Sequence, residues 1–282
     1  MAEATGLKTQ NLRLGTRATA ARRFPASIGR FDDPAARSTI DALVSWVEDH
    51  YREDLKRRPS KHVYIRTLPD ALVAQVDRIR DSEVIREAIL QHFDADCAIT
   101  PMKHTDELYI SHYNEDRGGD QGLYGKHYDG NLRFVPYGSV VRALIYLQSD
   151  ATYKVVFGDS RVERAFATYE FGLLDFHREL HWVEGEYNPA DQQRILIKCN
   201  YLIAPRGAGL AARLVLGANT AVFYVVKAAM EYSKSPKNPP QIVVGLLCNF
   251  FRVLNNVHPL VPLALISAVA AAGGWGLLRL AG

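Results

Sequence analysis

The chain has 282 residues, 48% of them hydrophobic, and a formal net charge of +3. This length and apolar fraction allow one sizeable hydrophobic core, and the slight charge argues against a nucleic-acid-binding protein, which usually carries a dense Lys/Arg face. The three cysteines, Cys97, Cys199 and Cys248, lie far apart and form no CxxC pair. They therefore indicate neither a zinc ribbon nor a disulfide framework, and they suit a reducing, intracellular compartment.

Residues 1–37 are rich in Ala, Arg, Thr and Gly and show little apolar periodicity. This composition predicts a flexible arm or a targeting segment, although Glu3 departs from the acid-poor pattern of transit peptides. Two amphipathic helical stretches are predicted next, within residues 38–58 and 68–93, because apolar residues recur there at three- and four-residue spacing.

Short β-branched and aromatic runs follow, separated by Gly, Asp, Asn and Pro, and they predict strands. The runs lie at residues 106–113, 140–148, 153–158, 169–177 and 194–203. Helices first and strands after indicate an α+β domain of residues 38–205, in which an antiparallel sandwich or jelly roll carries helices on one face. The sequence has no GxGxxG, P-loop or GxSxG motif, which argues against dinucleotide, nucleoside-triphosphate and serine-hydrolase chemistry.

Residues 206–282 form an apolar tail. Its first helical stretch carries only Arg213 and Lys227, and residues 259–278 contain no charge at all before Arg279. About twenty apolar residues can cross a bilayer, so the tail predicts a helical segment that associates with a membrane. The alternative is a helical bundle that buries its own apolar faces or caps the main domain.

A polar triplet, His127-Tyr128-Asp129, stands between the first two predicted strands of the domain. On an extended segment, His127 and Asp129 point to the same face. Taken alone, the triplet also fits an ordinary turn that ends in Asp129-Gly130. A further histidine, His181, follows the fourth predicted strand. Two imidazoles and one carboxylate leave three positions of a metal ion open, which is the arrangement used by non-haem Fe(II) oxygenases.

Arg194 begins the last predicted strand, shortly after His181. A guanidinium binds a carboxylate through two parallel charge-assisted hydrogen bonds, and a 2-oxo acid that chelates iron by its keto-acid end needs such an anchor at its far carboxylate. Lys198 shares the strand face of Arg194 by parity and is the alternative anchor.

Several quoted runs carry a family resemblance: "LYISHY" with "YGKHYD", "VVRALIYLQ", "YEFGLLDFHRELHWVEG" and "RILIKCNYLI". The segment from Leu108 to Ile203 resembles the 2-oxoglutarate and Fe(II)-dependent dioxygenases, most closely their prolyl-4-hydroxylase-like branch. The resemblance implies a double-stranded β-helix core of the jelly-roll or cupin type, here with N-terminal packing helices. Neither the arm nor the apolar tail belongs to it.

The resemblance also implies the roles of individual residues. His127, Asp129 and His181 are the expected Fe(II) ligands and catalytic residues, Arg194 is expected to bind the C5 carboxylate of 2-oxoglutarate, and Tyr113 matches a tyrosine that lines the co-substrate pocket. Ascorbate is a further candidate cofactor. The usual Gly-Gly-x-Thr turn after the Tyr-Leu strand is replaced by "SDATYKVVFGD", so the substrate class does not transfer.

Three other residues compete for places in this site. His177 is an alternative distal ligand, but the position of Val183 and the shorter gap to Arg194 favour His181. His112 is expected on the opposite face of its strand. Arg142 lies in the middle of a predicted strand and is interpreted as a structural charge, with a substrate contact as the alternative.

The activity implied by the resemblance is oxidation, most simply hydroxylation, of a C–H bond in a small molecule or a protein, with release of succinate and CO2. A membrane-associated tail favours a lipid-soluble or membrane-anchored substrate. A second hypothesis, from a different class, is a membrane-anchored scaffold or binding protein without catalytic activity on the same fold. The sequence indicates no particular oligomeric state.

Overall fold

The computed structural model describes residues 24–57, 60–93, 97–112, 126–129, 139–149, 154–184 and 193–208, together with parts of 210–247. Tyr113, the predicted pocket tyrosine, lies outside these ranges, and so do all residues from 248 onward.

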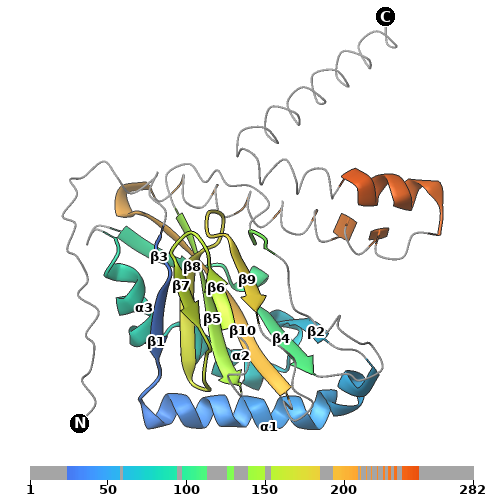
Figure 1. Cartoon of the computed structure of the whole chain (residues 1–282). Coiled ribbons are helices and arrows are strands. Elements are labelled where there is room, and N and C mark those ends of the chain that lie inside the picture. Colours follow the sequence, from blue (N-terminus) through green and yellow to red (C-terminus); the bar gives the residue numbers. More distant parts are fainter. Residues whose placement is uncertain are drawn as a thin grey trace, which may run out of the picture.

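A large antiparallel sheet forms the centre of the described chain (Figure 1). Its strands follow the order β1-β8-β5-β10-β4-β2, and β3 pairs with the C-terminal half of β10. The strands are β1 Ser27–Arg30, β2 Ser60–Tyr64, β3 Cys97–Pro101, β4 Glu107–His112, β5 Ser139–Gln148, β8 Glu170–Asp175 and β10 Gln193–Pro205. The predicted strands within residues 106–113, 140–148, 169–177 and 194–203 are confirmed as β4, β5, β8 and β10.

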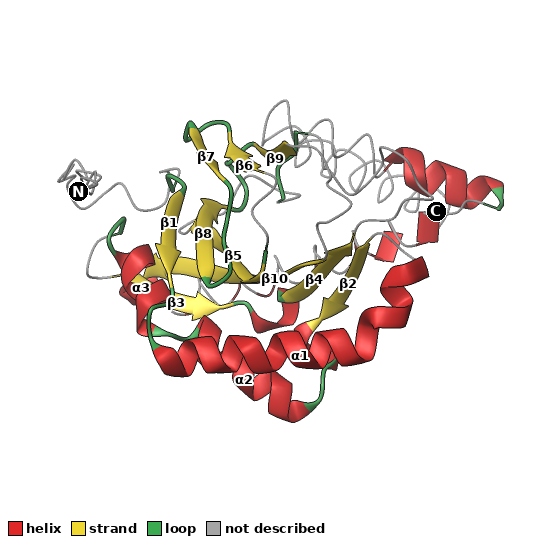
Figure 2. Ribbon diagram, turned by 60° about the horizontal axis from the view of Figure 1, so that its bottom comes forward, coloured by secondary structure: helices red, strands yellow, loops and turns green. Residues whose placement is uncertain are grey.

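A smaller antiparallel sheet, in the order β7-β6-β9, lies across from the large one, on the side away from the helices (Figure 2). It consists of β6 Lys154–Phe157, β7 Val162–Arg164 and β9 His181–Glu184. Two facing antiparallel sheets with helices outside one of them make a jelly-roll-like α+β arrangement, as predicted. This arrangement leaves an interior between the sheets.

Helices cover the outer face of the large sheet (Figure 2). They are α1 Pro34–Arg57, α2 Asp70–Arg80 and α3 Glu83–Leu90. The predicted helical stretch 68–93 is interrupted at residues 81–82, between α2 and α3. The structure also differs from the predicted arm of residues 1–37 in its last part, because β1 pairs with β8 and α1 already begins at Pro34.

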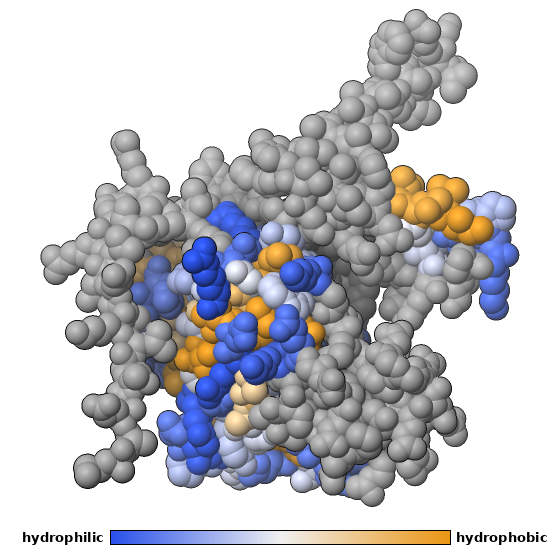
Figure 3. All heavy atoms as spheres, viewed as in Figure 1, coloured by the Kyte–Doolittle hydropathy of each residue, from blue (hydrophilic) through white to orange (hydrophobic). Residues whose placement is uncertain are grey.

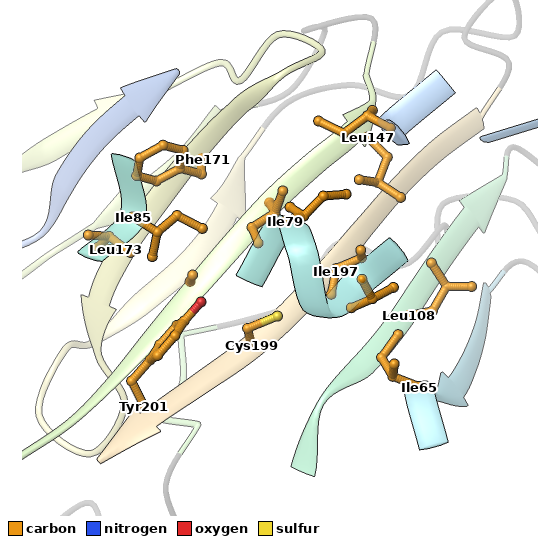
Figure 4. Close-up of a cluster of buried hydrophobic side chains, with 14 of the residues drawn as sticks. Ile65, Ile79, Ile85, Leu108, Leu147, Phe171, Leu173, Ile197, Cys199 and Tyr201 are labelled. Carbon is orange, nitrogen blue, oxygen red and sulfur yellow. The ribbon is translucent and has the colours of Figure 1, made fainter. Parts of the chain in front are cut away.

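Successive side chains of a strand point to opposite faces of the sheet, and the helices pack on the face that carries the apolar ones. The main core contains one face of β10, including Ile195, Ile197 and Cys199, packed with helix residues such as Ile79 and Ile85 (Figure 4). Burial of each such side chain stabilises the fold by about 1.5–3 kcal/mol relative to exposure. A sheet covered by helices on one face must place every second residue there.

The other face of β10 carries Arg194, Leu196, Lys198 and Asn200, and it points toward the small sheet. Leu196 belongs to a second core cluster with β6 residues such as Phe157. Polar residues that alternate with the helix-facing core are therefore directed into the interior between the two sheets.

The apolar tail is described only in parts. In residues 237–247, the side chains of Ile242, Val243, Leu246 and Leu247 are exposed, and Figure 3 shows apolar atoms gathered at this end of the molecule. Within the described residues, no helix combines the length and the hydropathy that crossing a bilayer requires. The predicted membrane segment, residues 259–278, falls outside the part of the chain that the structure describes.

Candidate metal centre

His127 and His181 meet where the segment 126–129 pairs with the start of β9. Each backbone N–H donates to the carbonyl of the other residue at 3.0 Å, and the ring centroids lie 4.4 Å apart. The ammonium of Lys126 lies 4.5 Å from the ring centroid of Trp182, which further ties the segment to β9. Two histidines far apart in the sequence are thus held side by side by main-chain hydrogen bonds.

The strand that carries His181 is positioned by the turn that follows β6. Glu179, fully buried, accepts hydrogen bonds from the backbone N–H groups of Asp159 and Ser160 at 3.1 and 3.0 Å. The backbone N–H of Leu180 donates to the Asp159 carboxylate at 2.9 Å. These bonds fix the two residues before His181 and so determine where its ring lies.

Asp129 completes a cluster with the two histidines. Its Oδ1 lies 3.6 Å from Nε2 of His127, and its Oδ2 lies 3.4 Å from Nε2 of His181. Within the described residues, these three side chains form the group whose possible ligand atoms all lie within 4.8 Å of one another. Neighbouring ligands on one metal ion are about 3 Å apart when the metal–ligand bonds are about 2.1 Å, so the spacing fits a single cation.

His181 is prepared to act as a neutral ligand. Its Nδ1 lies 3.2 Å from the carbonyl oxygen of Glu179, and because a carbonyl only accepts, the proton resides on Nδ1. The lone pair of Nε2 then faces Asp129, which is the orientation that metal-binding histidines usually obtain from such a partner. Burial lowers the pKa of His181 to about 4, partly offset by Asp129, so protons compete little for this nitrogen near neutral pH.

Arg142 binds the carboxylate of Asp129 directly, with Nη1 2.6 Å from Oδ2. Its Nε donates to Oδ1 of Asn200 at 2.9 Å, and its guanidinium lies 4.4 Å from the ring centroid of Phe176. Although burial alone would raise it, the positive charge of Arg142 helps to hold the pKa of Asp129 well below its usual range. The sequence interpretation of Arg142 as a structural charge is thus incomplete, because its side chain contacts the carboxylate of the His127–Asp129–His181 cluster.

The contact between Arg142 and Asn200 continues through the large sheet to its helical face. The backbone N–H of Asn200 donates to Oδ1 of Asp106 at 3.1 Å, and Oδ2 of Asp106 accepts from Arg80 on α2 at 2.9 Å. All these polar groups are buried, and the side chains of a buried network hold one another in place when their hydrogen bonds are satisfied. The orientation of Arg142 at Asp129 is supported from behind in this way.

Arg194 lies in the same interior, farther along β10. It is buried, its Nε donates to Oγ of Ser111 at 3.2 Å, and its guanidinium lies 5.4 Å from the ring centroid of Tyr109. The ammonium of Lys198 lies 4.9 Å from the same centroid. Arg194 and Lys198 therefore lie on the same face of β10, as their even spacing along the strand predicted. The side chain of His112, at the end of β4, lies outside the described set.

His177, the alternative distal ligand, is buried but is not part of the cluster. Its Nδ1 is enclosed and has no hydrogen-bond partner among the residues that the structure describes. Burial, followed by the charges of Arg178 and Arg142, lowers its pKa to about 3. Folding thus holds this imidazole neutral.

The buried state of His177 leads to a pH-dependent stability. The unfolded imidazole takes up a proton near pH 6.5 and the folded one only near pH 3, so stability is lost as the pH falls through that window. Between pH 8 and pH 5 the loss is about 2 kcal/mol. In urea titrations at the two pH values, His177→Leu is expected to lose about 2 kcal/mol less unfolding free energy than the wild type. His50→Leu, an exposed change on α1, is the control and should behave like the wild type. Equal pH profiles for His177→Leu and wild type would contradict this assignment.

No protein-family model and no curated protein matches the sequence. Solved structures similar to this chain include prolyl hydroxylases and other 2-oxoglutarate-dependent enzymes, the family that the sequence motifs resemble. A prolyl hydroxylase from Trichoplax adhaerens, in complex with a hypoxia-inducible-factor peptide, is 15% identical with a TM-score of 0.42, covering 63% of this chain and 83% of its own.

Two further structures are similar to a comparable degree. The prolyl-4-hydroxylase of Pseudomonas putida is 15% identical with a TM-score of 0.38, over 63% of this chain and 91% of its own. HygX of Streptomyces hygroscopicus, with nickel and 2-oxoglutarate bound, is 12% identical with a TM-score of 0.40, over 64% of this chain and 82% of its own.

Proposed function

We propose that the protein is an Fe(II)- and 2-oxoglutarate-dependent dioxygenase with a double-stranded β-helix core. One observation carries the proposal: His127, Asp129 and His181 each bring a ligand atom within 4.8 Å of the others between the two sheets of a jelly-roll-like pair. Two histidines and one carboxylate suit Fe(II) and leave coordination positions for other molecules. Bound Fe(II) would supply the oxidising chemistry with dioxygen as the oxidant: one oxygen atom would enter succinate as 2-oxoglutarate loses CO2, and the other would oxidise a substrate C–H bond, by default to an alcohol.

The side chains of this chain have distinct parts in the proposed reaction. His127, Asp129 and His181 hold the metal, and Arg142 occupies the second oxygen of Asp129 so that this carboxylate binds the metal through one oxygen. Arg194 binds the C5 carboxylate of 2-oxoglutarate with a charge-assisted hydrogen bond. We assign Tyr113 to the co-substrate pocket from the sequence motif alone.

The surroundings of the site support chemistry that requires exclusion of water. Tyr109, Leu144, Tyr146 and Leu196 are buried and form a wall of apolar and aromatic side chains on the interior face of the large sheet. Charged groups interact more strongly in such a medium than in water, so the bound co-substrate is held firmly. The proposed reaction is a hydroxylation, and its proposed substrate is a small molecule or a protein.

Anaerobic titration of the protein with Fe(II) and 2-oxoglutarate tests the proposal. A weak visible absorption band from chelation of the 2-oxo acid is expected with the wild type and is expected to be lost in His127→Ala, whose side chain is partly exposed. His50→Ala on the surface of α1 is the matched control and should retain the band. A wild-type protein without the band would favour the non-catalytic scaffold.

A further inference from the structure

Lys198 occupies a central place in the interior between the sheets. The register of β10 sets it opposite Leu144 of β5 and Glu107 of β4. It stands between Arg194 and Asn200, the residues on the same strand face that contact Ser111 and Arg142. Its side chain therefore lies on the face of β10 that is directed toward the small sheet, and its charge interacts with that of Asp129.

The ammonium of Lys198 forms no hydrogen bond or ion pair with any residue that the structure describes. Its close contact is the ring of Tyr109, with the centroid 4.9 Å away. Burial and the nearby charge of Arg142 lower the pKa of Lys198, and the negative charges of Asp129 and Glu107 only partly offset this effect. Lys198 is only partly exposed, and a charge that is largely withdrawn from water usually has a partner, because removal from water is costly.

Arg142 has unused hydrogen-bonding capacity beside Lys198. Its described contacts engage Nε, with Asn200, and Nη1, with Asp129. A guanidinium has five N–H donors, so the residues that the structure describes leave Nη2 available. The ring of Phe176 lies against the plane of the guanidinium and helps to hold it in place.

The charges of the interior do not balance, even with the proposed metal and co-substrate. The described residues contribute three cations, Arg142, Lys198 and Arg194, and two carboxylates, Asp129 and Glu107. Fe(II) and the dianion of 2-oxoglutarate add charges that cancel. One positive charge remains without a counterpart among the described groups.

We propose that the substrate of this enzyme carries a carboxylate, which Lys198 binds beside the metal with help from Nη2 of Arg142. The inference rests on the proposed dioxygenase function and names the substrate class for the same site. Arg194 is occupied by the co-substrate, so Lys198 and Arg142 form a separate anion-binding pair. The apolar part of the substrate then packs on the aromatic wall of the interior.

Benzoate and benzamide, which differ in charge but hardly in shape, test the proposal. Each is titrated calorimetrically into the full-length protein loaded anaerobically with Fe(II) and 2-oxoglutarate, while the visible band reports that 2-oxoglutarate stays bound. Benzoate is expected to bind roughly tenfold or more tightly than benzamide, because it forms charge-assisted hydrogen bonds. Lys198→Met is expected to remove that preference, and Lys198→Arg to keep it.

The outcomes separate the substrate proposal from the proposed function. Absence of the band in the wild type, before any probe is added, removes both. A normal band with equal binding of benzoate and benzamide overturns the substrate proposal alone. A Lys198→Met protein that melts like the wild type but binds 2-oxoglutarate weakly and keeps its benzoate preference also overturns it, because Lys198 is then the co-substrate anchor.

Discussion

Asp129→Asn is expected to weaken Fe(II) binding at least ~100-fold. Loss of a residue that only hydrogen-bonds to a metal ligand already weakens metal binding by up to about 100-fold, and Asp129 is proposed to be a ligand itself. The substitution removes the negative charge that attracts the cation but leaves an oxygen to accept the hydrogen bond from Arg142, which lies 2.6 Å away in the wild type. Removing the acceptor completely, as in Asp129→Ala, would strand a buried guanidinium and destabilise the fold by about 3–5 kcal/mol. Asn is therefore the informative replacement.

Anaerobic Fe(II) titration measures this effect, and thermal melting shows whether the fold persists. The control is Asp49→Asn on the exposed surface of α1, which should bind Fe(II) like the wild type. If Asp129→Asn melted normally and kept wild-type affinity for Fe(II), Asp129 would not be a ligand.

Arg194→Met is expected to raise the dissociation constant of 2-oxoglutarate by about 30-fold or more, because loss of one partner from a buried charge pair costs about 2–5 kcal/mol. Arg194 is buried, and Ser111 and the Tyr109 ring hold its guanidinium in place. Arg194→Lys keeps the charge but loses the planar fork, so an intermediate affinity is expected.

Titration of 2-oxoglutarate against the Fe(II)-loaded variants measures this difference through the visible band. Arg206→Met, an exposed change immediately after β10, is the matched control. A normal affinity in Arg194→Met combined with a weak one in Lys198→Met would transfer the role to Lys198, the alternative that the strand pattern left open.

Much of the fold could be predicted from local patterns. The β-branched and aromatic runs anticipated β4, β5, β6, β8 and β10, and their place after the helices indicated the α+β class. Short strands such as β1, with the sequence "SIGR", carry too few apolar residues to show alternation. β1 forms because β8 offers backbone groups for it to pair with, which is a tertiary effect.

The choice between His177 and His181 as the second histidine ligand shows what sequence spacing can and cannot predict. Four residues separate them, so strand parity does not distinguish the two. The structure separates them through the turn after β6, whose bonds to Glu179 and Leu180 direct His181 toward His127. His177 is instead enclosed, and no described residue forms a hydrogen bond with its Nδ1.

The sequence by itself determined the strand pattern, the shared face of His127 and Asp129, and the shared face of Arg194 and Lys198, because alternation is a local property of extended chains. Only the tertiary structure decided that Arg142 binds Asp129 and that the Lys198 ammonium stands in the interior without an ion pair to any described residue. Both facts depend on which strands become neighbours. Hydrogen bonds between β5, β8 and β10 decide that across long sequence separations, and no local pattern encodes it.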